Sequence, residues 1–380
     1  MLAAILASVL MFGLPASPYI VRPGTARILS ILRVDGSGDA HILPAPSIES
    51  LPSSEGLRPF LVDQIGFSED DLNSMETGQT VVRILKAADR SEIAAFGIVR
   101  LNASKDLFLQ KFRDIVNFKK SPEVVGSGKF SVPPTLRDLR GLEIDPDDIE
   151  ALKNCQPGDC DVKLSAAEMS RFQKEINWTA LDYKEKATAL FKEIVFERLK
   201  SYISGGNSAL AEYDDQKNSV KQGDELKSLL GASPYLYDFA PALLNYLRDY
   251  PKAPATGIES FEYWSKEKFG LKPVISITHT AIFRKTVNGQ SEVLIASKQI
   301  YASHYFQASL GLTILADDLD AQGKPVTYLM YLNRSRSDAL AGGFSPVRRS
   351  IVASRTRQGM EKYLKMVKSK VESAAPRSAS

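Results

Sequence analysis

The chain has 380 residues, of which 44% are hydrophobic and 24% charged, and its formal net charge is +3. These values are ordinary for globular proteins and allow two average domains, or one domain with a large insertion. So small a net charge, without long Lys/Arg runs interleaved with aromatic residues, argues against nucleic acid as a partner.

Residues 1–17 carry no charged side chain and contain a short apolar block that ends at Pro15, Ala16 and Ser17. The block is shorter than the ~20 apolar residues that span a bilayer, and it is typical of the hydrophobic region of a secretory signal. We therefore predict cleavage near Ala16 or Ser17 and a secreted or periplasmic protein, although no Lys or Arg precedes the block. The alternatives are a buried N-terminal helix and a start upstream of Met1.

Cys155 and Cys160 are the only cysteines, and the turn dipeptide Pro157-Gly158 between them can bring the two sulfurs together. We predict a structural disulfide, which agrees with export and contributes roughly 2 kcal/mol in the chain-entropy model. Zinc is the competing interpretation, but Cys-x4-Cys has no second ligand pair, and redox catalysis normally uses Cys-x-x-Cys. We expect no metal and no cofactor.

The order of segments predicts an α+β fold, in which an antiparallel β meander grips a long C-terminal helix and a large helical insertion interrupts the domain. The segments are 1–17, signal-like; 18–78, an N-terminal extension; 79–131, the first part of the α+β domain; 132–272, the helical insertion; 273–373, the meander and C-terminal helix; and 374–380, a disordered tail.

In the first part of the domain, Val81–Leu85 and Ile93–Leu101 are rich in β-branched and apolar residues, which predicts two strands. Ser104 is a suitable N-cap for a following helix with Phe108 and Phe112 at helical spacing. In the insertion, a capping box at 165–168 and an apolar stripe over 182–204 predict helices.

The meander is predicted from four β-rich runs with short connections, which favour antiparallel pairing. These runs are Val274–Phe283, Val293–Phe306, Ala308–Ala316 and Val326–Asn333. A final helix over Pro346–Glu372 has an apolar stripe that includes Met360 and Leu364.

The stretch Ile93–Leu101, the helix from Lys105 to Val116, and the meander followed by the amphipathic segment Ser350–Glu372 resemble the START-like proteins. This superfamily is also called SRPBCC or helix-grip. The resemblance covers 79–131 and 273–373, and it implies a cavity between the sheet and the C-terminal helix for lipids, sterols or polyketides. The helical block at 132–272 departs from the family, which normally inserts far less there.

The polar residues of the meander that are best suited to acid/base chemistry or ligand binding are His279, Lys298 and His304, because they lie among apolar strand residues. Alternation places Lys298 and His304 on one sheet face and Tyr301 on the other, provided that no bulge intervenes. A histidine at such a position is most often a hydrogen-bonded core residue, and an acid/base or ligand-orienting role is the alternative.

Arg334 and Arg336 close the last strand beside Asp338, which suggests either a salt-bridged corner or a site for an anion or lipid headgroup. The C-terminal helix is rich in Lys and Arg, which is typical of a solvated face, with peripheral contact to an anionic membrane as the alternative.

No complete catalytic motif is present: no P-loop, no Gly-x-Ser-x-Gly and no His-Glu-x-x-His. We therefore expect a binding or carrier protein for a hydrophobic, lipid-like molecule, with Met360 and Leu364 gripping it beside the polar candidates above. The alternatives are an enzyme of cyclase or hydrolase type that uses His279, Lys298 or His304, and a structural envelope-associated protein without a pocket.

Overall fold

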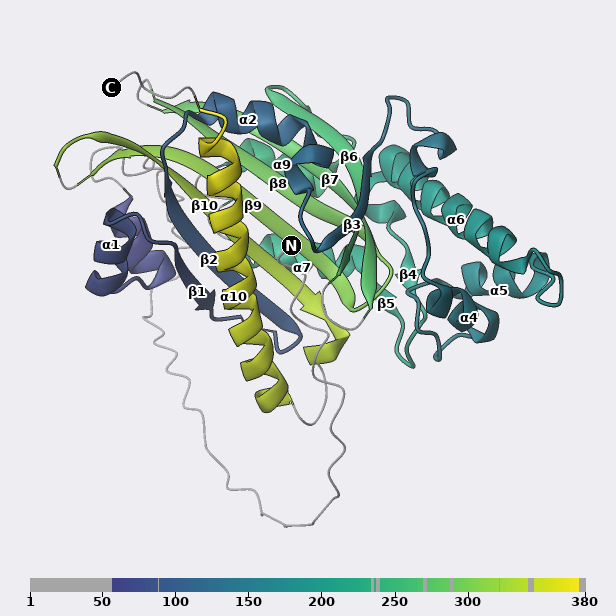
Figure 1. Ribbon diagram of the computed structural model, residues 1–380. Helices are drawn as coiled ribbons and strands as arrows, with labels where there is room; N and C mark the ends of the chain where they lie inside the picture. The colour runs from purple at the N-terminus through teal and green to yellow at the C-terminus, as the bar shows by residue number, and fades with distance from the viewer. Residues whose placement is uncertain are drawn as a thin grey trace, which may run out of the picture.

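The computed structural model describes residues 57–375, apart from 88, 234–235, 237–239, 269–271, 288–289, 321 and 341–344. It confirms the predicted α+β fold: an antiparallel sheet of eight strands carries helices on both faces, and a long C-terminal helix packs on the sheet (Figure 1). The signal-like segment, most of the N-terminal extension and the end of the tail lie outside the described residues.

The sheet has the strand order β1-β2-β10-β9-β8-β7-β6-β3. Its strands are β1 (Val81–Leu85), β2 (Glu92–Leu101), β3 (Val124–Lys129), β6 (Ile258–Lys268), β7 (Pro273–Val287), β8 (Gln290–Ala302), β9 (Phe306–Leu319) and β10 (Pro325–Ser337). Strands β6 to β10 are neighbours both in sequence and in the sheet, which confirms the meander. Strand β10 then pairs with β2, so the two parts of the domain form one sheet.

Two segments differ from the sequence-based expectation. Strand β6 lies within 132–272, so the helical insertion ends before this strand and not at residue 272. Its five charged residues, Glu259, Glu262, Lys266, Glu267 and Lys268, conceal the apolar alternation that identifies a buried strand. The N-terminal extension, for which no helix was predicted, contains a short π-helix η2 (Phe60–Ile65) and helix α1 (Glu69–Glu76).

The remaining helices connect or cover the strands. They are α2 (Lys105–Arg113), α3 (Ile115–Lys119), η3 (Leu136–Leu139), α4 (Pro146–Asn154), α5 (Ala166–Glu175), α6 (Tyr183–Gly205), η4 (Gly206–Ala209), α7 (Gln222–Gly231), α9 (Pro241–Asp249), η5 (Asp338–Leu340) and α10 (Ser345–Glu372). A two-stranded ribbon, β4 (Glu212–Tyr213) and β5 (Val220–Lys221), lies in the insertion.

Helices α2, α3 and α10 cover one face of the sheet, which we call the α10 face (Figure 1). Phe108 and Phe112 of α2, Phe118 of α3 and Leu364 of α10 share its apolar core. Helix α10 approaches β2 closely at Gly97, where an added Cβ would lie 2.6 Å from Leu364 Cδ1. A glycine within this strand is thus explained by close helix–strand packing.

The insertion, together with α1 of the N-terminal extension, covers the opposite face, which we call the insertion face. Helices α1, α7 and α9 share a core with Phe96 of β2 and Leu312 of β9. Helices α4, α5 and α6 pack on the other end of the sheet, around Trp264 of β6 and Ile277 of β7. Both sheet faces are therefore buried, and each can hold a site.

Candidate functional site

A cavity of about 70 Å³ lies on the α10 face, between the sheet, α3 and α10. Its lining comes from eight elements and comprises Phe112, Ile115, Phe118, Lys119, Val124, Tyr263, Glu267, Ser297, Thr313, Tyr331, Tyr363 and Met366. Since one water molecule needs about 10–15 Å³, the cavity has room for several waters or for a small chemical group.

An ion pair forms the polar wall of this cavity. Lys119 Nζ lies 2.7 Å from Glu267 Oε1 and 5.3 Å from the centre of the Tyr263 ring, while Ser265 Oγ donates a hydrogen bond of 2.6 Å to the same carboxylate oxygen. Burial disfavours both charges, but their mutual attraction outweighs it, so the pKa of Lys119 is raised and the pKa of Glu267 is lowered. Both groups remain ionised at neutral pH, and they present a fixed dipole to an occupant.

Two tyrosines form the wall beside α10. The rings of Tyr331 on β10 and Tyr363 on α10 have centroids 5.3 Å apart. Burial raises the pKa of Tyr331 to about 12 and also raises the pKa of Tyr363. Both hydroxyls therefore remain protonated at neutral pH and can donate a hydrogen bond to an occupant.

The sheet surface beneath α10 changes from apolar to polar along the strands. On β8, β9, β10 and β2, the cross-strand row Val293, Leu315, Leu329 and Val99 is apolar, and its neighbour on β7 is Arg284. Four residues further along β8, the row on the same strands is Ser297, Gly311, Asn333 and Ala95, and Thr280 on β7 lies next to Ser297.

Most of the polar groups at this end of the face are buried. They include Ser265, Ser276, Thr278, Thr280, Gln299, Ser309, Thr313, Asn333 and Ser335. Ser309, Asn333 and Ser335 satisfy one another at 2.8–3.3 Å, whereas Thr280 Oγ1 and Gln299 Oε1 find no hydrogen-bond partner among the described residues. Because buried polar atoms normally have partners, this surface is suited to water or a polar ligand.

A second polar centre lies on the insertion face, where Glu262, His279 and Lys298 are direct cross-strand neighbours on β6, β7 and β8. His279 Nδ1 lies 2.6 Å from Tyr202 Oη, and its Nε2 lies 3.3 Å from Tyr246 Oη. Burial, and then the charge of Lys298, hold the pKa of His279 well below its usual range. The ring is therefore neutral at physiological pH.

Lys298 is fully buried and packs against helices of the insertion. Its Nζ donates to Asn207 Oδ1 at 2.8 Å and to Leu247 O at 3.3 Å, and it lies 4.7 Å from the centre of the Tyr202 ring. Burial lowers the pKa of Lys298 to about 7, although Glu262 opposes the shift. Asn207 also lines a cleft of about 800 Å³ between η4, α7 and α9, so the amine lies directly behind a residue of the cleft wall.

A β-bulge overturns the predicted faces of β8. The register shifts between Ile277, which pairs with Tyr301, and Thr278, which pairs with Gln299. The extra residue, Ile300, places Tyr301 on the insertion face together with Lys298. Tyr301 accordingly packs against Arg198 of α6, with the guanidinium 4.8 Å from the ring centre.

His304 belongs to a different group from His279. Its Nε2 lies 3.0 Å from Asp148 Oδ2, and its Nδ1 lies 2.8 Å from the Asp161 carbonyl oxygen. Lys272 Nζ also reaches Asp148, at 3.4 Å, and Asp161, at 3.0 Å. Burial opposes ionisation of Asp148, but the hydrogen bond and charge of His304 outweigh it and lower the pKa of that carboxyl. These contacts join α4 to the sheet, and they do not form a shared cleft with His279.

Arg334 and Arg336 form a salt-bridged corner on the insertion face. Arg334 Nε lies 3.0 Å from Glu92 Oε1, and Arg336 Nη1 lies 2.6 Å from Glu225 Oε2 of α7. Both guanidinium groups thus pair with carboxylates of the chain itself, and the alternative of an anion site at these residues stays a prediction.

Met360 and Leu364 are fully buried but are not among the residues that line the cavity. Both side chains pack over Gly97 of β2. Their helix neighbours Tyr363 and Met366 line the cavity instead. A ligand in this cavity would therefore contact α10 at Tyr363 and Met366, neither of which was predicted as a ligand-binding residue.

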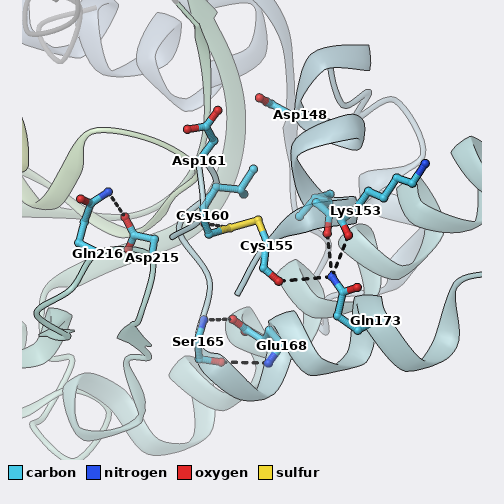
Figure 2. The surroundings of a disulfide bond; sticks show 12 residues. Asp148, Lys153, Cys155, Cys160, Asp161, Ser165, Glu168, Gln173, Asp215 and Gln216 are labelled. Carbon is cyan, nitrogen blue, oxygen red and sulfur yellow. Dashed lines mark hydrogen bonds between the residues drawn. A yellow bond between two sulfur atoms is a disulfide. The ribbon is translucent and has the colours of Figure 1, made fainter. Parts of the chain in front are cut away.

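The predicted disulfide is present between Cys155 and Cys160, directly after α4 (Figure 2). Figure 2 also shows Gln173 of α5, whose side-chain amide donates to the carbonyl oxygens of Leu152, Lys153 and Cys155 at 3.2–3.3 Å. The bridge and this amide together fix the end of α4 against α5. The disulfide is typical of proteins from oxidising compartments.

Two other features are absent from the described residues. No group of three or more His, Cys, Asp or Glu side chains is arranged to hold a metal ion. No described helix is both long and apolar enough to cross a membrane.

Comparison with known proteins gives no family assignment, because no protein-family model matches the chain and no curated protein matches its sequence significantly.

Proposed function

We propose that this protein binds and carries an amphipathic small molecule between the sheet and α10. The observation that carries the proposal is the composition of the α10 face, which is apolar in one cross-strand row and polar four residues along β8. A cavity lies at this polar end, and an ion pair and tyrosine hydroxyls line it. An apolar ligand body would lie against the apolar rows, and its polar group would meet Lys119, Glu267 and Tyr363.

The proposed occupant is a narrower class than the hydrophobic, lipid-like ligand that the sequence suggested, because it must also carry a polar group. Burial of apolar surface contributes roughly 25 cal/mol per Å², which would hold the body of the ligand. A polar group is required as well, because buried hydroxyls and amides without partners cost free energy. A fatty acid, a lysolipid or another single-headed amphiphile has both parts. Because the cavity of about 70 Å³ has room only for the polar group, the apolar body would have to separate α10 from the apolar rows.

The fold supports the same proposal. The chain order of strands in the meander, the pairing of β10 with β2, and α10 across the sheet agree with a START-like relationship, which we also propose. We further propose export to a secreted or periplasmic location, where a disulfide persists. The signal-like segment on which export depends lies outside the described residues.

The enzyme alternative places the chemistry at His279 and Lys298. Both side chains have no exposed surface and are hydrogen-bonded to Tyr202, Tyr246 and Asn207. A substrate would have to displace these partners before it reached either group. The carrier proposal requires α10 to move away from the apolar rows that it covers, whereas the polar group of the ligand already has a cavity. A chain without any bound molecule would favour the structural alternative.

Filling the cavity should expel the ligand. In the double variant Ser297→Leu/Thr313→Leu, added side-chain atoms would occupy the space between β8, β9 and α10. We expect the amount of small molecule recovered by organic extraction of purified protein to fall at least about tenfold, which corresponds to about 1.4 kcal/mol of binding free energy. The measurement is quantitative mass spectrometry of the extract per mole of protein.

The matched control is Ser297→Ala/Thr313→Val, which removes the same hydroxyl groups without adding volume. It should retain most of the ligand. Both proteins should still unfold cooperatively, since overpacking costs roughly 1–3 kcal/mol. Equal ligand recovery from the two double variants would show that the molecule does not occupy this cavity.

A further inference from the structure

The first half of α10 differs in charge from the second half. From Ser345 to Met360 the helix contains four arginines and no Asp or Glu. Beyond this point, Lys362, Lys365 and Lys368 are each ion-paired, to Glu123, Glu361 and Glu372 respectively. The positive charge of the first half is therefore not balanced within the helix.

Two exposed aliphatic side chains lie among these arginines. Val347 is 65% exposed and Ile351 is 37% exposed, and they are one helical turn apart. The packed side of the same segment is formed by Val352, Thr356 and Met360, which are at most 3% exposed. Val347 and Ile351 therefore point away from the sheet.

The position of this half-helix leaves it accessible. Figure 1 shows the N-terminal end of α10 projecting beyond the ends of the strands. Arg349 is bonded within the fold, because its guanidinium donates to the carbonyl oxygens of Arg90 and Glu92 at 2.9 and 2.8 Å. It is therefore not available to a partner. Within the part of the chain that the structure describes, Arg348, Arg355 and Arg357 have no ion-pair partner. Three guanidinium groups thus surround an exposed aliphatic pair.

We propose that the first half of α10 docks the protein on an anionic membrane surface, with Arg348, Arg355 and Arg357 on lipid phosphates and Val347 and Ile351 in the acyl boundary. A bilayer offers negative charge directly above an apolar layer, which matches this arrangement. Guanidinium pairs bidentately with phosphate, which favours arginine at such a surface. The proposal does not depend on the ligand proposal, and either can fail without the other.

The test is co-sedimentation of the full-length protein with vesicles of phosphatidylcholine alone and of phosphatidylcholine mixed with phosphatidylglycerol. We expect binding to the anionic vesicles only, weakening as salt is added. Each arginine should contribute roughly a fivefold factor, so Arg348→Gln/Arg355→Gln/Arg357→Gln should lower the partition coefficient by roughly a hundredfold. Val347→Ser/Ile351→Ser should lower it by a further measurable factor without any change in charge.

The control removes three exposed positive charges elsewhere, as Lys184→Gln/Lys200→Gln/Lys227→Gln in the insertion. This variant has the same net charge as the arginine variant and should bind like the wild type. Equal loss of binding in the two triple variants, or equal binding of the wild type to both kinds of vesicle, would overturn the proposal. Displacement by inorganic phosphate, but not by chloride at equal ionic strength, would identify a free-phosphate site and would also overturn it.

Discussion

Replacing Lys163 with methionine is expected to lower the free energy of unfolding by about 3–5 kcal/mol. The Lys163 side chain is only 2% exposed, and its Nζ pairs with Asp338 and, at 3.2 Å, with Asp215. Burial opposes the charge of Lys163, but the two carboxylates outweigh it and raise the pKa of the amine. Methionine would leave the buried Asp215 and the partly buried Asp338, 5% and 27% exposed, without their cation. Urea denaturation at neutral pH measures the loss.

The control for this variant is Lys186→Met, which breaks an exposed pair with Asp182 whose side chains are 55% and 50% exposed. That change should cost at most about 0.5 kcal/mol, because exposed pairs contribute little. If Lys163→Met were as stable as Lys186→Met, the contacts of Lys163 would not hold the insertion to the end of β10.

The free energy of unfolding of the wild-type protein should rise by about 2 kcal/mol between pH 7 and pH 9 because of Lys298. Burial lowers the folded-state pKa of this amine to about 7 from an ordinary value of 10.5. Between these two values the unfolded chain binds a proton that the folded protein has released, so stability increases with pH. Below pH 7 both states are protonated, and the full cost of the buried charge remains.

In the Lys298→Met variant this rise should disappear, because no group titrates at that position. Urea denaturation at a series of pH values compares the two proteins, and Lys186→Met again serves as the control. Parallel stability curves for the wild type and Lys298→Met over pH 7–9 would show that Lys298 keeps an ordinary pKa, contrary to the packing described here.

Long periodic segments explain why most of the fold could be predicted from the sequence. The stripe over 182–204 and the final helix correspond to α6 and α10, and the β-rich runs correspond to β7–β10. Strand β6 was not recognised, because its charged residues find buried partners far away in sequence, such as Lys119 for Glu267 and Asp145 for Lys266. Sequence periodicity cannot reveal such partners.

The candidate site could be predicted only in part. His279 and Lys298 were singled out and are cross-strand neighbours, but their environment depends on Tyr202 and Asn207 from the insertion. The lining residues Lys119, Tyr263 and Tyr363 come from three separate elements, and only the packing of those elements reveals them.

One feature of the sequence does indicate the polar surface at the candidate site. The polar residues Ser309, Thr313, Asn333 and Ser335 share the parity of the α10 face, which favours a polar surface beneath the C-terminal helix.

The central claim, that a molecule is held between the sheet and α10, is tested most directly by native mass spectrometry of the purified wild-type protein. Spectra before and after denaturation should differ by the mass of one small amphiphile per chain, and organic extraction should recover a molecule of that mass. The difference should be lost in Ser297→Leu/Thr313→Leu and retained in Ser297→Ala/Thr313→Val. A wild-type mass equal to that of the polypeptide alone, in protein purified without detergent from its native compartment, would contradict the carrier account and favour a structural protein.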